Sequence, residues 1–467
     1  MKKEIIIELK KVISRAQKID IEEDKLTMDD ILENIYQLFP NLAVISGNLF
    51  FWMGSHYEKL EDQYQEQGFF IKNLLKKLLG KKYIRKNDVL AVHKELLNDY
   101  HFPTNLGENV TAINMLNGIL VIDNTQTTLI EHDEKYGMRY IIPYAYDPKA
   151  QAPLFKQFLE EVICEKQAIN VLLEYMGYIL LNRSINYETA LLLYGEGRNG
   201  KSVLLKIMSA FIGSNNTSYV ELQDLNNPNR VVMLDGKLVN IGSDSSDKNF
   251  DSSFFKKVIS GEPVAARQLF KDTYDVTDLP RFVFAMNNLP RTNGDTSFGL
   301  IRRLLIIHFD KIIKQEDIDR ELFTKLEAEL SGILNLAIAG AQRLLAQGHF
   351  THSNKIAKAV KTYEDDINLV KRFVEDHNII HNEDSRMTNT QLYNMFSIWC
   401  IDEGIKAPNK RYLIKKISSL GFISYKNNAI RGFKILADEP IKTIESSSIF
   451  ENTSTKTEHE LILDKKI

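Results

Sequence analysis

The sequence LLLYGEGRNGKSVL, residues 191–204, places three glycines, an arginine, an asparagine and a Lys-Ser pair between two apolar runs. The first run belongs to TALLLY (189–194), which is short and apolar and is typical of a buried strand. The second run predicts a helix over residues 202–211. A strand, a glycine-rich loop and a helix in this order indicate an α/β fold.

Residues 195–202, GEGRNGKS, fit the spacing G-x-x-x-x-G-K-[ST] of a phosphate-binding loop. The glycines let backbone N–H groups point at an anion, and the next helix adds its positive end. Lys201 is expected to reach the outer phosphates and Ser202 to ligate Mg²⁺. A chance match at an ordinary turn is the alternative, but the flanking strand and helix favour nucleotide binding. The predicted binding residues are Gly195, Glu196, Gly197, Arg198, Asn199, Gly200, Lys201, Ser202 and Val203.

Three further short apolar runs follow downstream, separated by helical or loop segments. They are KLVNIG (237–242), RFVFAM (281–286) and RLLIIHF (303–309). Short apolar strands that alternate with helices are typical of a parallel sheet covered by helices. The segment from Glu188 to about Asp310 is therefore predicted to be one α/β domain.

Polar residues stand where three of these strands begin or end. Asp244 follows one strand, where a phosphate-loop enzyme needs an acid to hold Mg²⁺, although turn aspartates are common. Asn287 and Asn288 follow another, either as a polar sensor near the γ-phosphate or as turn formers. Arg302 and Arg303 precede the last strand. An arginine there can act on a neighbouring subunit's γ-phosphate, and a surface pair is the alternative.

Taken in order, these segments resemble the superfamily 3 helicases, a branch of the AAA+ ATPases found in small viruses and mobile elements. Among them, the chain is most similar to the poxvirus and phage/plasmid primase–helicase group. The likeness covers residues 110–310, with a weaker extension to 436. It rests on LLLYGEGRNGKSVL (191–204), FFKKVISGEPVAARQLFK (254–271), FVFAMNNLP (282–290) and RRLLIIHF (302–309).

The resemblance implies an ATP-driven DNA helicase that assembles as a homo-hexameric ring and moves along single-stranded DNA. Its cofactors are then ATP and Mg²⁺, the latter held by Ser202 and Asp244. The implied catalytic residues are Lys201 as the Walker A lysine, Asp244 as the Walker B acid, Asn287 as the sensor asparagine and Arg303 as the arginine finger. Arg302 is the second choice of arginine finger. Residues 261–276 correspond to the group's DNA-contacting hairpin, in which Arg267 and Lys271 would touch the strand.

One departure from the group's pattern keeps a second function open. Many relatives carry two adjacent acids at Walker B, whereas here Ser245 follows Asp244 and the next acid is Asp247. The group that polarises the attacking water is therefore undetermined. The alternative is an ATP-switched initiator or loader that binds DNA without unwinding it. A small-molecule P-loop kinase is a weaker rival, because it would not explain the basic segment 406–434.

That segment, 406–434, holds eight Lys and Arg residues and no acid. A helix over 409–420 followed by GFISYK (421–426) and IRGFKIL (430–436) is the outline of a winged-helix domain. A solvated basic face is the alternative. The predicted DNA contacts are Lys410, Arg411, Lys415, Lys416, Lys426 and Arg431. A second basic stretch, 71–86, predicts an amphipathic helix whose charged face is either solvated or a partner surface.

The length of 467 residues indicates several domains, and the 44% content of hydrophobic residues is normal for a globular protein. The fold class expected is α/β, an AAA+ P-loop core with a parallel sheet, helical N-terminal domains and a C-terminal winged-helix domain. The predicted domains are a mostly helical region with strand character at 42–52 (1–105), an α+β or helical domain (106–185), the ATPase (186–350), the winged helix (356–436) and a disordered tail (437–467). Within 106–185, short strands are predicted in 114–123 and 138–148, and helices in 153–163 and 168–181.

The composition also limits the kinds of partner and the cellular compartment that we expect. A net charge of −3 gives no global reason to expect a polyanion partner, so any nucleic-acid surface must be local. Cys164 and Cys400 form no C-x-x-C pair, which favours a reduced, cytoplasmic protein, here in a bacterial host. No 18-residue apolar run predicts a membrane span. The expected partners are single-stranded and origin DNA and a separate primase or polymerase.

Overall fold

The computed structural model describes residues 27–437 of the chain, apart from 41, 46–47, 61–65, 80–85, 100–110, 123–125, 245–249, 268–272, 291, 293–296, 406 and 428–429. The chain divides into two compact units. The first extends to Tyr363 and the second begins at Glu364, so the division falls inside helix α13 (Asn354–Asp366). Residues 1–26 and the predicted disordered tail from residue 438 lie outside the described residues.

The N-terminal part of the first unit combines helices with a small antiparallel sheet. Its elements are α2 (Met28–Leu38), β1 (Leu42–Ile45), β2 (Asn48–Trp52), β3 (Tyr57–Lys59), α3 (Glu66–Leu79) and α4 (Lys86–Asp99). Ile35, Leu49 and Leu74 are fully buried in its core. The strand character predicted at 42–52 is confirmed, and β3 was missed. The helix predicted over 71–86 begins earlier than expected and ends at Leu79.

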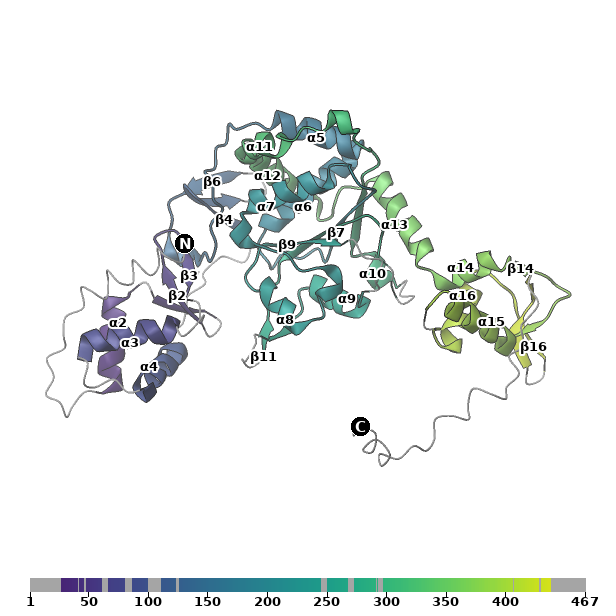
Figure 1. Cartoon of the computed structure of the whole chain (residues 1–467), viewed down its shortest axis with the longest axis horizontal. Coiled ribbons are helices and arrows are strands. Elements are labelled where there is room, and N and C mark those ends of the chain that lie inside the picture. Colours follow the sequence, from purple (N-terminus) through teal and green to yellow (C-terminus); the bar gives the residue numbers. More distant parts are fainter. Residues whose placement is uncertain are drawn as a thin grey trace, which may run out of the picture. The chain divides into compact units, whose positions relative to one another are not determined.

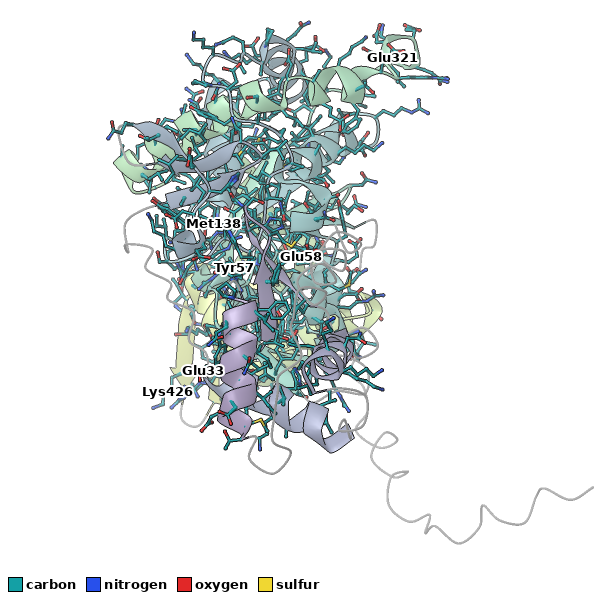
Figure 2. All side chains as sticks on the ribbon, turned by 90° about the vertical axis from the view of Figure 1, so that its left-hand side faces the viewer. Glu33, Tyr57, Glu58, Met138, Glu321 and Lys426 are labelled. Atoms are coloured by element: carbon teal, nitrogen blue, oxygen red, sulfur yellow. The ribbon has the colours of Figure 1, made fainter. Side chains whose placement is uncertain are left out.

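Three antiparallel strands and two helices follow. They are β4 (Thr111–Met115), β5 (Gly118–Ile122), β6 (Thr127–Ile130), α5 (Pro153–Ile163) and α6 (Lys166–Leu180). The strands predicted in 114–123 and both helices are confirmed. The strand predicted in 138–148 is wrong, because Pro143 and Pro148 lack the N–H donors that a ladder needs and only an isolated bridge forms at Ile142. The backbone N–H of Tyr57 donates to the carbonyl oxygen of Met138 at 2.6 Å and joins β3 to this segment (Figure 2).

A five-stranded parallel sheet forms the centre of the first unit. Its strands are β7 (Ala190–Tyr194), β8 (Thr217–Ser218), β9 (Val239–Asp244), β12 (Arg281–Met286) and β13 (Leu304–His308). They lie in the order β13-β7-β12-β9-β8, and every neighbouring pair is parallel. The four predicted strands are therefore confirmed. The edge strand β8 was missed because it consists of only Thr217 and Ser218, which give no apolar run.

Helices cover both faces of this sheet (Figure 1). On one face α6, α7 (Lys201–Ile212) and α12 (Leu330–Gln347) share a core with the sheet residues Leu191, Leu193 and Val283. On the other face lie α8 (Pro228–Val231) and α9 (Ser252–Ile259) (Figure 1). Because apolar side chains point to both faces, the strands are nearly continuous apolar runs, as the sequence indicated.

A β-hairpin is inserted between α9 and β12. Its strands β10 (Val264–Arg267) and β11 (Thr273–Val276) pair antiparallel, with Val264 opposite Val276. The connection between them, which includes Lys271, lies outside the described residues. The hairpin begins a few residues after α9 and ends just before β12, so its two roots both lie against the body of the sheet domain.

The part of the second unit that the structure describes contains three helices after α13 and short antiparallel strands. They are α14 (Leu369–Asp376), β14 (Ile380–His381), β15 (Met387–Thr388), α15 (Asn389–Asp402), α16 (Lys410–Ser419), β16 (Ser424–Asn427), β17 (Ile430–Phe433) and β18 (Ile435–Leu436). One sheet has the order β15-β17-β16 and another pairs β14 with β18. Phe373, Phe396 and Leu413 are buried in its core. The predicted helix over 409–420 and the strands after it are present, as α16 and as β16 to β18.

Within the described ranges, no helix combines the length and hydrophobicity that a membrane crossing requires.

Candidate functional site

The loop between β7 and α7 has a backbone that only glycine adopts readily. Gly195 has a φ of +150° and Gly200 a φ of +91°, both in the region that disfavours other residues. A Cβ atom at Gly195 would lie 2.5 Å from the carbonyl oxygen of Phe309, and one at Gly200 would lie 3.0 Å from Cγ1 of Val162. The loop is therefore packed closely against neighbouring segments on its inner side.

Lys201, the first residue of α7, folds back over this loop. Its Nζ atom donates hydrogen bonds to the carbonyl oxygens of Gly195 at 2.5 Å and Glu196 at 2.9 Å, and to Oδ1 of Asn199 at 3.1 Å. The residue is only 7% exposed, and burial lowers the pKa of its ammonium group. The ammonium group of Lys201 therefore lies at the centre of the loop, surrounded by oxygen atoms.

Backbone contacts fix the loop from the side of β13. The N–H of Phe309 donates to the carbonyl oxygen of Tyr194 at 2.8 Å, and the N–H of Ile313 donates to that of Arg198 at 2.7 Å. The Nδ2 atom of the buried Asn199 donates to the carbonyl oxygen of Phe309 at 3.4 Å. The outer residues, among them Glu196, Arg198 and Ser202, are exposed. These hydrogen bonds fix the shape of the loop, and its outer residues face the solvent.

The register of the sheet brings the predicted acid and sensor to the same edge. Met286 of β12 pairs with Tyr194 on one side and with Asp244 on the other. The glycine-rich loop between β7 and α7 follows Tyr194 directly, and the exposed Asn287 follows Met286. The side chain of Asp244 lies outside the described part of the chain, as do Ser245 and Asp247.

No metal-binding cluster of His, Cys, Asp or Glu is found among the described residues. The metal role predicted for Ser202 and Asp244 remains a prediction. Ser202 is exposed at the start of α7, and Asp244 is placed only through the backbone of β9.

The two arginines lie at the opposite edge of the sheet. Arg303 precedes β13, and its carbonyl oxygen accepts a 2.8 Å hydrogen bond from the N–H of Ala190, the first residue of β7. Lys201 comes after the last residue of β7. Five strand residues span roughly 16 Å, so Arg303 and the loop of the same chain do not meet.

Arg303 is held by three oxygen acceptors. Its Nη2 atom donates to Oε2 of Glu188 at 2.8 Å and to Oγ of Ser260 at 2.6 Å, and its Nη1 atom donates to the carbonyl oxygen of Gly299 at 2.5 Å. Arg302 binds the same oxygen of Glu188. The side chain of Arg303 is 9% exposed and that of Arg302 is 41% exposed. Burial lowers the pKa of Arg303, while Glu188 opposes that effect.

Arg303 also lines a pocket of about 440 Å³. The other lining residues are Asp251, Ser253, Phe254, Lys256, Lys257, Ser260 and Glu262. The pocket is therefore lined by two lysines and an arginine, which can donate hydrogen bonds to an anion, and by two carboxylates.

The basic residues predicted to bind DNA are mostly exposed. Helix α16 buries Leu413 and Ile417 and exposes Arg411 and Lys415. Lys410 donates to Oγ1 of Thr390 at 2.8 Å, and Lys416 lies over the ring of Tyr412 at 6.0 Å.

In the hairpin of the second unit, Lys426 is exposed (Figure 2) and its register partner is the exposed Arg431. Like charges that lie directly opposite each other destabilise a hairpin.

The remaining predicted surfaces are on separate elements. Arg267 is exposed at the end of β10, opposite Thr273, and Lys271 is outside the described residues. Lys72, Lys76 and Lys77 are exposed on α3.

Sequence reasoning missed Glu188, which contacts both arginines. No spacing pattern could have found it, because its partners lie 114 and 115 residues away.

Two family models match the chain. Residues 35–164 match a model described as D5 N terminal like, and residues 193–303 match a family of unknown function, DUF5906. Among solved structures, the chain is similar to the A form apo structure of the NrS-1 C terminal region, with a TM-score of 0.36 and 13% identity over 72% of this chain and 98% of that one. The apo structure of the same region, residues 305–718, gives the same TM-score and identity and is covered completely. Each of the two family models matches one segment of the chain, and the two segments do not overlap.

Proposed function

We propose that this chain is an ATP-driven replicative DNA helicase of the superfamily 3 branch of AAA+ ATPases. It would form a homo-hexameric ring that moves along single-stranded DNA during replication of a phage, plasmid or other mobile element in the cytoplasm of a bacterial host. The observation that carries the proposal is the placement of a glycine-rich, lysine-centred loop at one edge of a parallel sheet and an arginine pair at the other. The D5-type match supports the replication context.

The loop supplies the binding of ATP. Lys201 would exchange its oxygen acceptors within the loop for the outer phosphates. The backbone N–H groups of the loop and of the first turn of α7 would donate to the phosphate oxygens. Ser202 and Asp244 would hold Mg²⁺, which neutralises part of the phosphate charge when it is bound. Asn287, at the end of the adjacent strand, would orient the attacking water.

The arginine pair supplies the argument for a ring. An arginine that neutralises charge on the transferred phosphoryl group must come within hydrogen-bond distance of it. Arg302 and Arg303 lie at the far edge of the sheet from the loop of their own chain. A neighbouring subunit would therefore supply the arginine, with the pocket that contains Arg303 and Lys257 facing the bound nucleotide.

Two basic surfaces would bind DNA. Arg267 on the β10–β11 hairpin, with Lys271 beyond the described residues, would contact the single strand in the ring. In the second unit, α14, β14, β15, α15 and α16 are followed by the β16–β17 hairpin, and this order supports the proposal of a winged-helix domain. It would bind origin DNA. Its proposed phosphate contacts are Lys410, Arg411, Lys415, Lys416, Lys426 and Arg431.

The deciding experiment is ATP hydrolysis by the purified chain with and without single-stranded DNA, beside a Lys201→Ala variant. The helicase proposal expects DNA to stimulate turnover and the variant to abolish it. A strand-displacement assay on a forked duplex then tests unwinding directly.

An ATP-switched initiator or loader is the second candidate, and Ser245 in place of a second Walker B acid favours it. This candidate expects tight ATP binding, turnover that DNA does not stimulate and no strand displacement. A separate primase or polymerase would complete the replication machinery in either case.

A further inference from the structure

The segment just before β7, which includes Asn186 and Glu188, lies beside the base of the β10–β11 hairpin and beside the arginine pair. The β10–β11 hairpin is entered after Ser260, at the end of α9, and left before Arg281, at the start of β12. Asn186 contacts both of these roots, and Glu188 contacts both arginines. No role in the proposed reaction has so far been given to Asn186 or Ser260.

Asn186 is hydrogen bonded to both roots of the hairpin. Its Nδ2 atom donates to the carbonyl oxygen of Ser260 at 2.9 Å, and its Oδ1 atom accepts from Nη1 of Arg281 at 3.1 Å. The same oxygen accepts from the hydroxyl of Tyr178 at 2.6 Å and from the N–H of Glu188 at 2.9 Å. The side chain of Asn186 thus connects the entry and the exit of the hairpin to the segment just before β7, the strand that precedes the glycine-rich loop.

Ser260 connects the same root to the arginine pair. Its hydroxyl accepts from Nη2 of Arg303 at 2.6 Å, while that nitrogen also donates to Glu188 at 2.8 Å. Arg302 binds the same carboxylate oxygen. A movement of Arg303 therefore changes a hydrogen bond at the entry of the hairpin directly.

A buried arginine and a strained backbone position lie beside these contacts. Arg281 is 6% exposed, stands 4.0 Å from the ring of Tyr178 and donates to the carbonyl oxygen of Ile185 at 2.6 Å. Burial lowers the pKa of Arg281 to about 10, so the group stays charged at neutral pH. Glu188 has a φ of +50°, which a non-glycine residue adopts only when its surroundings hold it there. Because Arg303 donates directly to the hydroxyl of Ser260, a displacement of Arg303 reaches Ser260 without an intermediate residue.

We propose that Asn186 and Ser260 are positioning residues that couple the arginine pair to the β10–β11 hairpin. When an anion draws the arginines away from Glu188, Ser260 loses its bond to Arg303, and Asn186 passes the change to both hairpin roots. The proposal rests on the proposed function only in naming that anion, a phosphate of a nucleotide on a neighbouring subunit.

The test is hydrogen–deuterium exchange of the full chain in the absence of nucleotide and DNA. Ser260→Ala removes the acceptor for Arg303 and keeps the backbone carbonyl that binds Asn186. The amides of β10 and β11 are expected to exchange about fivefold faster, the size of effect that one lost hydrogen bond gives. Ser260→Thr keeps the hydroxyl and should restore the wild-type rate. Ser253→Ala, at the same pocket, is the matched control and should leave the hairpin unchanged.

Asn186→Asp tests the second link, because it keeps the oxygen acceptors and loses the donor to Ser260. Faster exchange confined to β10 and β11 is again expected. Unchanged hairpin exchange in both variants would overturn the coupling, and so would an increase spread evenly over the chain, which reports lost stability alone. If the hairpin responds as expected but DNA never stimulates ATP turnover of the wild-type protein, the coupling stands and the helicase proposal fails.

Discussion

The two ends of strand β7 are built in different ways. At its carboxyl end, consecutive residues make the loop, and Lys201 finds its acceptors within six positions of itself. At its amino end, Glu188 binds Arg302 and Arg303, and Arg303 in turn binds Ser260, so the partners come from segments far apart in the chain. Nearby residues supply the acceptors of Lys201, although Phe309 also packs against the loop, whereas the acceptors of Arg303 come from distant segments that meet only in the folded domain.

The largest effect is expected from Gly195→Val at the carboxyl end. Its Cβ would meet the carbonyl oxygen of Phe309 at 2.5 Å, so the loop must change shape. We expect ATP affinity to fall by about 100-fold, since the donors to the phosphates are displaced together. Titration with a fluorescent ATP analogue measures it. At Gly197 an added Cβ meets nothing within 4 Å, so Gly197→Ala should cost far less affinity, and equal losses would contradict the close packing at Gly195.

Mixed assemblies test whether the two ends meet across subunits. A Lys201→Ala chain and an Arg302→Ala/Arg303→Ala chain should each be inactive alone. In an equal mixture, about a quarter of the subunit contacts would join an intact lysine to an intact arginine, so about a quarter of the ATP turnover should return. Circular dichroism checks that both chains are folded. No recovery at any mixing ratio would mean that the arginines do not act on a neighbour.

The two arginines should differ in their effect on stability. Arg303 is 9% exposed and Arg302 is 41% exposed. Arg303→Ala leaves Glu188 and Ser260 without a buried partner and should lower the free energy of unfolding by about 2 kcal/mol, less than for a fully buried pair. Arg302→Ala should lower it by less than about 1 kcal/mol. Urea unfolding at pH 7 measures both, and a reversed order would show that Glu188 depends mainly on Arg302.

The smallest effect concerns the ionisation of Lys201. Burial lowers the pKa of its ammonium group, so the charge that attracts phosphate is lost at a lower pH than for a free lysine. ATP affinity should therefore decline as the pH rises through the alkaline range below 10.5, the ordinary pKa. Calorimetric titration between pH 7 and 10 measures the decline. A Lys201→Arg chain stays charged throughout, and a decline of the same slope in that variant would assign the effect to another group.

The difference between the two ends also explains which parts of the fold the sequence predicts. The strand–loop–helix unit and the four apolar strands follow from short-range patterns, and all of them are present. The edge strand β8 gives no such pattern because it is two residues long. The segment 138–148 looked like a strand by its apolar content, and its two prolines prevent the ladder.

The site is predictable to a similar extent. Lys201, Asp244 and Asn287 could be placed from the sequence because parallel strands bring their carboxyl ends to one edge. The partners of Arg303 could not, since a serine after α9 and a glutamate before β7 have no common spacing. Only packing of the complete domain determines which acceptors a buried guanidinium finds.

The like-charged pair Lys426 and Arg431 on the hairpin of the second unit has a consequence for ionic strength. Mobile ions screen the repulsion between these two exposed side chains, so added salt should make this hairpin slightly more stable in the free protein. The same ions compete with the side chains for phosphate, so added salt should weaken the DNA binding that we propose for this surface. The free and bound forms of one pair of residues should therefore respond to salt in opposite directions.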